Sequence, residues 1–271
     1  MNILIYGVGG IGGFLGAFLL KAGYNVTFLS RGKNYLNLKT NGLILQSTAG
    51  FQSYKNIDII SEFKNYKKFD IIIVCVKLYD FDQVIDAIRD NVSKECIVLP
   101  FQNGIYSEEI LKEKLFHNPL FGAVAQISAH LDNDSRVIHN GKLATFFIGC
   151  IFKNKYSKKL QFFSDNCKKF GLDIRYTEKI SEKIWDKFIF LSAYSGMTTL
   201  TQLTIGQIFE NKKYRKMFIS AMNETFELTS FFKVNFNYDP VKSWEKKIEK
   251  MPYDMTSSMY LDFKNKRKLE L

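Results

Sequence analysis

The N-terminal stretch Met1–Lys21, with the sequence MNILIYGVGGIGGFLGAFLLK, decides the fold. Its first six residues predict a buried strand, and Ile11–Lys21 has the spacing of a helix that places Phe14, Phe18 and Leu19 on one side. The glycines between these two segments form a GxGxxG motif in the strand, turn and helix context that binds the pyrophosphate of a dinucleotide.

Each glycine of this motif has its own role. Gly7 allows the tight turn, Gly9 lets the pyrophosphate approach the backbone, and Gly12 lets the helix and strand pack closely, with the helix N-terminus facing the anion. A purely structural glycine turn is the alternative. The position directly after the first strand and before a second strand, Asn25–Leu29, favours dinucleotide binding.

The uncharged run Ile3–Leu20 is long enough to suggest a membrane-spanning segment or a signal peptide. Its six glycines would each cost a continuous helix about 1 kcal/mol relative to alanine, and no positively charged segment precedes it. We therefore expect neither a membrane span nor a targeting segment.

The cysteines and histidines lack the spacings of metal sites and of CxxC motifs. They are Cys75, Cys96, Cys150, Cys167, His117, His130 and His139. We expect reduced cysteines in a cytoplasmic protein without a bound metal. The net charge of +11 is spread along the chain without a block of like charges, so a small anionic ligand explains it as well as a nucleic acid does.

The second strand ends in Ser30-Arg31-Gly32-Lys33, about twenty residues after the glycines. A domain selective for NAD places Asp or Glu here to bind the ribose 2′-hydroxyl. A guanidinium instead donates two hydrogen bonds to phosphate oxygens, so Arg31 predicts NADPH as the cofactor. The alternative is that Arg31 is only a solvated loop cation.

Strands and helices alternate through the first third of the chain, which predicts a Rossmann-type doubly wound parallel α/β sheet. The further strands are Phe69–Val76 and Cys96–Leu99, and the helices are Phe81–Val92 and Gly104–Leu115. Ligands of such sheets bind at the carboxyl ends of the strands. Lys77 and Asn103 follow two strand ends and are candidates for contacts with the nicotinamide ribose or the substrate.

Later segments predict additional strands, partly antiparallel, that complete this sheet. They are Leu120–Ile127, Arg136–His139, Leu143–Cys150 and Asp173–Thr177, with turns at 132–134 and 140–141 and a helix at Ser157–Lys169. From Glu178 the periodicity is helical almost throughout. The sequence thus predicts a cofactor-binding domain at 1–177 and an all-α C-terminal domain at 178–271.

Lys187 is the candidate proton donor of the second domain. Helical spacing puts it on one face with Leu191 and Ser195, and Trp185 and Phe188 flank it. Poor solvation lowers the pKa of an ammonium and makes it a better proton donor near neutral pH. The alternative is a lysine that lies along the apolar face it covers.

The end of the chain holds a second group of polar residues. If the helix that begins near Ser258 runs on, Asp262, Lys266 and Glu270 follow on the same face at four-residue intervals. Ser257 or Ser258 could cap this helix and donate to a carboxylate. An ordinary solvated face with a serine cap is the alternative.

Taken together, these residues resemble the ketopantoate reductase (2-dehydropantoate 2-reductase) family over nearly the whole chain. The matching segments are Gly7–Gly13, Ser30–Gly32, Val76–Lys77, Gln102–Gly104, Trp185–Phe188, Thr256–Met259, Asp262 and Glu270. The resemblance implies an NADPH-dependent reduction of ketopantoate to pantoate. We expect the protein to be a monomer or a homodimer.

The resemblance also implies a role for each matching residue. It implies cofactor contacts at Gly7, Val8, Gly9, Gly10, Ile11, Gly12, Arg31, Lys77, Asn103, Ala129 and Glu270. It implies Lys187 as proton donor and Asn103, Lys187, Ser195 and Ser258 as substrate-binding residues. No metal, nucleic acid or membrane is implied.

Three positions depart from the family pattern. Members often carry Asn four and eight residues after the lysine and again further along, where this chain has Leu191, Ser195 and Ile205. The chain also ends one residue after Glu270, where members usually continue. Reduction of another 2-keto acid by NADPH is therefore one alternative function, and a non-catalytic NADP-binding regulatory protein is another.

Overall fold

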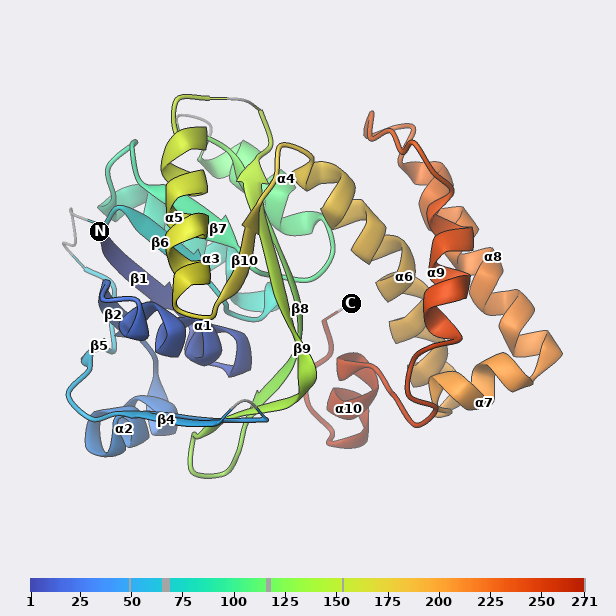
Figure 1. Cartoon of the computed structure of the whole chain (residues 1–271), viewed down its shortest axis with the longest axis horizontal. Coiled ribbons are helices and arrows are strands. Elements are labelled where there is room, and N and C mark those ends of the chain that lie inside the picture. The colour runs from blue at the N-terminus through green and yellow to red at the C-terminus, as the bar shows by residue number, and fades with distance from the viewer. Residues whose placement is uncertain (49, 65–68, 116–117, 153, 271) are drawn as a thin grey trace. The chain divides into compact units, whose positions relative to one another are not determined.

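The computed structural model describes residues 1–48, 50–64, 69–115, 118–152 and 154–270 (Figure 1). The chain divides into two compact units, Met1–Ile180 and Ser181–Leu271. No described helix is long and apolar enough to cross a membrane. The cysteines, all in the described part, are unpaired by disulfides.

The first unit contains two sheets and the helices that cover them. Its elements are β1 (Asn2–Tyr6), α1 (Gly10–Lys21), β2 (Asn25–Leu29), α2 (Gly32–Asn41), β3 (Leu43–Ser47), β4 (Gly50–Tyr54), β5 (Asp58–Ile60), β6 (Ile71–Val74), α3 (Leu78–Asn91), β7 (Ile97–Pro100), α4 (Tyr106–Lys114), β8 (Phe121–Leu131), β9 (Val137–Cys150), α5 (Ser157–Lys169) and β10 (Asp173–Tyr176).

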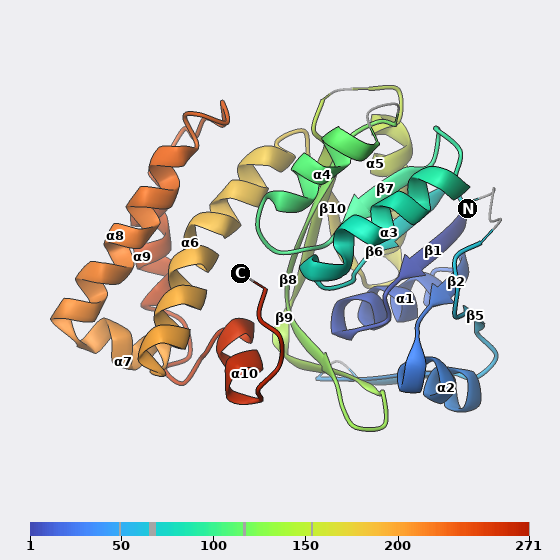
Figure 2. The same cartoon turned by 180° about the vertical axis from the view of Figure 1, so that it is seen from behind.

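The first sheet is parallel, with strand order β5-β2-β1-β6-β7, which is the Rossmann arrangement. Alternate residues of β1 enter different cores. Ile3 and Ile5 pack with α1, whereas Leu4 and Tyr6 pack with α3 and α4. Figure 2 shows α3 and α4 on the face opposite α1. The predicted α/β doubly wound architecture is confirmed.

The later strands do not complete this sheet, so that expectation was wrong. β10, β9, β3 and β4 form a second sheet in that order, and β8 pairs with β9. This sheet covers the side of α1 that faces away from the first sheet, because Phe146 and Ile148 of β9 share a core with α1. The alternation of apolar residues shows that a segment is a strand but not which sheet it joins. The need to bury both sides of α1, which places these strands in a second sheet, could therefore not be predicted from the sequence.

The predicted turn at 140–141 was also wrong. These residues lie inside β9, which pairs with β8 as one long hairpin joined at 132–136. The pairing shifts after Ile127, which faces Ala144, while Ser128 faces Asn140. Gly141 has φ +77° and lets β9 accommodate the extra residues as a bulge.

The second unit is helical, as the sequence predicts. It contains α6 (Ile180–Thr201), α7 (Ile205–Glu210), α8 (Lys212–Leu228), α9 (Pro240–Ile248) and α10 (Ser258–Lys264). Side-chain caps fix four of the helix starts. Thr204 forms a capping box with Gln207, Asn211 caps α8, Asp239 caps α9 just before Pro240, and a serine caps α10.

The last helix ends at Lys264, so the condition that it runs on through Lys266 and Glu270 is not met. Lys266 has φ +54° and donates its backbone N–H to Phe263 O, while Arg267 N donates to Asp262 O at 2.8 Å. These two bonds form a Schellman motif, which terminates a helix. Of the two serines considered, Ser257 is the cap, because its side chain accepts from Tyr260 N.

Candidate active site

The glycine loop joins β1 to α1 with the geometry that the motif predicts. Gly7 has φ +98° and its N–H donates to Leu29 O at 3.1 Å. A Cβ on Gly7 would meet Val76, and a Cβ on Gly12 would meet the Gly7 carbonyl oxygen. Nothing lies within 4 Å of where a Cβ on Gly9 would stand. The second glycine therefore borders open space, whereas the first and third are enclosed.

Ala129 lies beside the start of α1. A Cβ on Gly10 would meet the backbone of Ala129 and His130, so this strand passes directly against the helix N-terminus. Val8 is 3% exposed and Ile11 packs into the main core. The structure thus brings Ala129 and the glycine loop together, as expected if both contact one ligand.

Arg31 is the N-cap residue of α2 and is exposed. Burial raises the pKa of Tyr6, and a hydrogen bond from the Arg31 guanidinium opposes this rise. Tyr6 ends β1 directly before the glycine loop, so its hydroxyl holds Arg31 near that loop. Asn34 adds a second connection: its Nδ2 donates to Val8 O and to Ser30 Oγ, both at 2.8 Å.

Lys77 and Asn103 follow the ends of the neighbouring strands β6 and β7, and each side chain is partly buried. Gln102 connects the two segments. It is 7% exposed, and its Nε2 donates to Val74 O at 3.1 Å and to Val76 O at 3.0 Å. Neither Gln102 nor Asn34 is predicted from the sequence as a site residue, because the sequence around an amide does not show which carbonyl groups it will contact.

Two acceptors at this edge of the sheet have no hydrogen-bond partner among the described residues. They are Asn34 Oδ1 and Gln102 Oε1, both buried. Most buried polar atoms in proteins are paired, so such atoms call for a ligand, water or ion. Together with the open side of Gly9, they fit a polar ligand at the carboxyl edge of the sheet.

Lys187 lies on α6 of the second unit and is partly buried. Burial lowers the pKa of its ammonium to about 8. Trp185 and Phe188, which flank Lys187 in the sequence, pack edge to face on each other with ring centroids 5.7 Å apart. A group that changes protonation near neutral pH is suited to proton transfer.

The neighbouring Asp186 anchors this part of α6. Its carboxylate accepts from the Tyr238 hydroxyl at 3.0 Å and lies 3.7 Å from the Lys247 ammonium. Its backbone oxygen accepts from Trp244 Nε1 at 2.7 Å. This cluster is not predicted from the sequence, and its effect is to fix the turn of α6 that carries Lys187.

Ser195 and Ser258 are placed by a buried pair of hydroxyl groups. Thr198, one turn after Ser195 on α6, lies 2.7 Å from Ser257 Oγ and also donates to Tyr194 O. Ser257 caps α10, so this contact fixes the position of Ser258, the first residue of the helix. Glu270 lies beyond the helix and does not share the Ser258 face.

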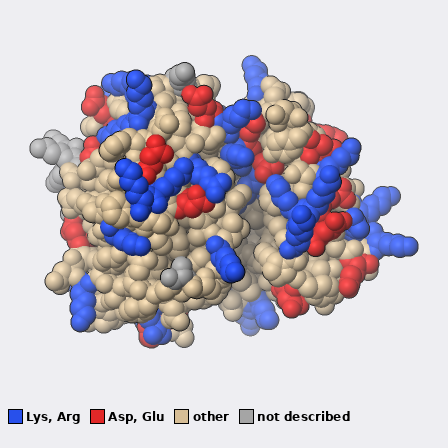
Figure 3. Space-filling model, in the orientation of Figure 1, with Lys and Arg blue, Asp and Glu red and all other residues tan. Residues whose placement is uncertain are grey.

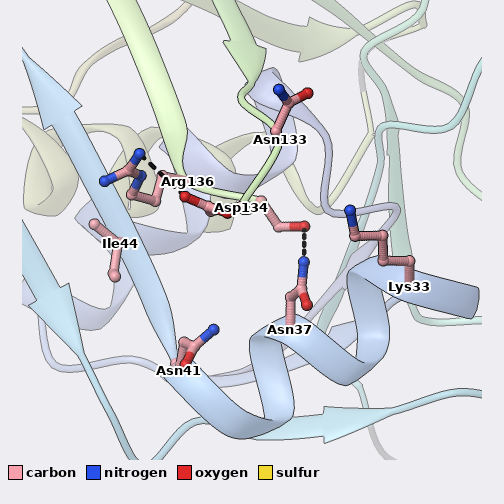
Figure 4. Close-up of a pocket in the computed structure, with 9 residues that line it drawn as sticks. Lys33, Asn37, Asn41, Ile44, Asn133, Asp134 and Arg136 are labelled. Carbon is pink, nitrogen blue, oxygen red and sulfur yellow. Dashed lines mark hydrogen bonds and ion pairs between the residues drawn. The ribbon is translucent and has the colours of Figure 1, made fainter.

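A pocket of about 300 Å³ elsewhere in the first unit contains none of the predicted site residues (Figure 4). It is lined by Lys33, Asn37, Asn41, Gly42, Ile44, Asn133, Asp134, Ser135 and Arg136. Arg136 is already paired with Asp132 at 2.7 Å and with Asp134 at 3.3 Å. The pocket is therefore not assigned to the chemistry of Lys187.

Basic and acidic side chains are interspersed on the surface seen in Figure 3. Arg136, Arg175 and Lys114, for example, each pair with a nearby Asp. No group of three or more potential ligand side chains among the described residues could hold a metal ion, and His117 lies outside those residues.

Two profiles of one family, described as ketopantoate reductase PanE/ApbA, match the chain. The profile of the family's first domain matches residues 3–151 and the C-terminal profile matches residues 179–271. The chain belongs to the ketopantoate reductase family. Ketopantoate reductases are oxidoreductases that act on CH–OH groups with a nicotinamide cofactor, and the chain is an enzyme of this class.

Relatives span most of the chain at modest identity. An uncharacterised oxidoreductase of Bacillus subtilis, YkpB, is 28% identical over 98% of this chain and 86% of its own length. The 2-dehydropantoate 2-reductase of Archaeoglobus fulgidus is 24% identical over 100% of this chain and 87% of its own length.

Solved structures share the fold. The 2-dehydropantoate 2-reductase of Methylococcus capsulatus superposes with a TM-score of 0.87 at 23% identity, covering 100% of this chain and 86% of that one. A D-mandelate dehydrogenase bound to NADH and anilino(oxo)acetate gives a TM-score of 0.86 at 20% identity, with coverages of 100% and 88%.

Proposed function

We propose that the chain reduces 2-dehydropantoate to pantoate with NADPH, with Lys187 as the proton donor. The observation that carries this proposal is the partly buried Lys187, whose pKa burial lowers to about 8. Membership of the ketopantoate reductase family supports the same reaction.

The residues at the carboxyl edge of the first sheet fit a dinucleotide. The open side of Gly9 leaves room for a pyrophosphate against the backbone, and the N-terminus of α1 favours negative charge there. Asn34 Oδ1 and Gln102 Oε1 supply unpaired acceptors for hydroxyl or amide donors. Lys77 and Asn103, which follow the strand ends, would contact the nicotinamide ribose.

Arg31 favours the phosphorylated cofactor in this proposal. It is exposed, is held by the Tyr6 hydroxyl, and stands at the N-terminus of α2, where the helix dipole also favours an anion. A guanidinium donates two parallel hydrogen bonds to phosphate oxygens. Arg31 would therefore bind the 2′-phosphate that distinguishes NADPH from NADH.

When bound, the cofactor supplies a hydride to the ketone carbon of the substrate. Lys187 holds a proton on Nζ and delivers it to the ketone oxygen, where negative charge develops. Its positive charge stabilises that oxygen before the transfer. Asp186 and its partners keep the α6 turn in place, which limits the freedom of Nζ.

Asn103, Ser195 and Ser258 would orient the substrate through hydrogen bonds, and Glu270 would contact the cofactor. Leu191 and Ile205 favour a second candidate, the reduction of a less polar 2-keto acid, because they stand where other members often have amides. In a site without these amides, a hydroxyl group of the substrate loses its hydrogen bonds to water and gains none from the protein. Such a site therefore binds a 2-keto acid with an apolar side chain better than one that carries a hydroxyl group.

A substrate panel tests these proposals. NADPH oxidation is followed with ketopantoate and with 2-keto acids bearing apolar side chains, for the unchanged protein and for Lys187→Ala. We expect kcat to fall by about 10² or more in the variant. Lys183→Ala, one turn earlier on α6, is the matched control. Bound NADPH without turnover of any keto acid would identify a regulatory NADP-binding protein instead.

A further inference from the structure

Asn34 joins the glycine loop to the end of β2. Its Nδ2 donates one hydrogen bond to Val8 O and a second to Ser30 Oγ, each at 2.8 Å. The Val8 carbonyl can only accept, so the nitrogen of the amide must face the loop. This fixes the orientation of the side chain and leaves Oδ1 on its other side.

Asn34 Oδ1 is buried and has no partner among the described residues. A donor is required there, and the two hydrogens on Nδ2 are already used. The segment between β2 and α2 is where Rossmann domains bind the adenosine ribose, whose hydroxyl groups are donors. A ribose hydroxyl thus has the chemistry that the unpaired oxygen needs.

Arg31 and Asn34 belong to the same end of α2. Arg31 is the N-cap residue of α2 and Asn34 lies in its first turn. The Arg31 carbonyl accepts from Tyr35 N at 3.3 Å, which ties the two residues through the helix backbone. Because Asn34 fixes this turn to Val8, it also sets the separation between the guanidinium and the glycine loop.

We propose that Asn34 sets cofactor preference by positioning Arg31 for the 2′-phosphate, and that its Oδ1 accepts a hydrogen bond from the adenosine ribose 3′-hydroxyl, which NADP and NAD both carry. This inference rests on the proposed dinucleotide function. The glycine motif does not require an amide at position 34. The proposed role of Asn34 in cofactor preference therefore rests on its contact with Val8 O, which the fold brings about.

Calorimetric titration of the protein with NADP⁺ and with NAD⁺ tests the inference without measuring activity. We expect Asn34→Ala to weaken NADP⁺ binding by about tenfold or more, the scale of one charge-assisted hydrogen bond, and NAD⁺ binding by only a few fold. Asn34→Asp keeps an acceptor but cannot donate to Val8 O. It should retain NAD⁺ better than Asn34→Ala and lose NADP⁺, because its charge also repels the phosphate.

Two further variants separate positioning from general damage. Asn37 lies on the same helix as Asn34 (Figure 4), and its Nδ2 donates to Ser135 Oγ at 2.9 Å. Asn37→Ala removes this bond and should leave the affinities for NADP⁺ and NAD⁺ unchanged. In an Arg31→Ala background, Asn34→Ala should weaken both dinucleotides equally, because the phosphate contact is already lost.

Equal losses of the two dinucleotides in Asn34→Ala with Arg31 intact, or no loss, would overturn the inference. Thermal unfolding of each variant shows whether the protein remains folded. Failure of the unchanged protein to bind either dinucleotide would refute the proposed function itself, and this outcome is distinct from an unchanged affinity in the variant.

Discussion

Lys187 should lose its proton within the pH range in which activity can be measured, because burial lowers its pKa to about 8. The protonated form is the donor in the proposed reduction, so kcat/KM for the keto acid should be level below this pH. Above it, kcat/KM should fall about tenfold per pH unit as the ammonium loses its proton. Stopped-time assays across the pH range at fixed ionic strength measure this profile.

Lys187→Arg is the control for that profile. A guanidinium keeps its charge throughout the accessible range and is a poor proton donor. The variant should retain cofactor binding, lose most of its turnover and show no fall in rate near pH 8. A native profile that stays flat up to pH 10 would contradict the role given to Lys187.

Glu108, in the first turn of α4, is a buried carboxyl group that the proposed reaction does not use. Burial raises its pKa to about 8, and its Oε2 accepts from Ser107 Oγ at 3.0 Å. The ordinary pKa of a glutamate in an unfolded chain is about 4.3. Between these values the folded state binds more protons than the unfolded state, so stability falls as pH rises.

Glu108→Gln should remove this loss because the amide stays neutral. The difference in unfolding free energy between the variant and the unchanged protein should grow in favour of the variant by more than about 1 kcal/mol from pH 5 to pH 8. Urea unfolding at the two pH values measures the gain. Glu109→Gln is the control, because it removes an exposed carboxylate 2.5 Å from Lys112. The same change in unfolding free energy between the two pH values should be less than about 0.5 kcal/mol in this variant.

At the level of elements, the end of α10 depends on one residue in an unfavourable conformation. Lys266 has φ +54°, a region in which glycine avoids the strain that a Cβ causes. Lys266→Gly should therefore stabilise the protein by about 1 kcal/mol in urea unfolding. Asn265→Gly, at φ −89°, should instead destabilise it. A loss of stability in Lys266→Gly would contradict the Schellman interpretation.

Elements with strong periodicity could be predicted from the sequence, and those that depend on tertiary contacts could not. The helix at Ser157–Lys169 has the predicted bounds. By contrast, the sequence made no prediction for α2, in which only Leu38 is buried, or for the β3–β4 pair. Their apolar pattern is too short to indicate a period.

The candidate site shows the same division. The glycine loop is specified by residues that need positive φ or close packing, and these are visible as glycines in the sequence. Asn34 and Gln102 act by bonding to particular carbonyl groups, Val8 O and Val74 O, which lie far away along the chain. Only the fold brings such partners together, so local patterns could not identify them.

For the whole molecule, the proposed contacts divide between the two units: Arg31 and the glycine loop belong to the first, and Lys187 and Glu270 to the second. A ligand that binds only the folded state stabilises it, by about 2.7 kcal/mol at a concentration 100 times its Kd. If the cofactor contacts both units, this stabilisation must reach the second unit as well as the first.

Both tryptophans, Trp185 and Trp244, lie in the second unit, so their fluorescence reports on that unit alone. The amide I infrared band of the strands, all of which in the described chain belong to the first unit, reports on the other. We expect saturating NADP⁺ to raise both unfolding midpoints.

In Arg31→Ala, more NADP⁺ should be needed for the same rise. A fluorescence midpoint that does not move while the strand signal does would show that Glu270 adds nothing to cofactor binding.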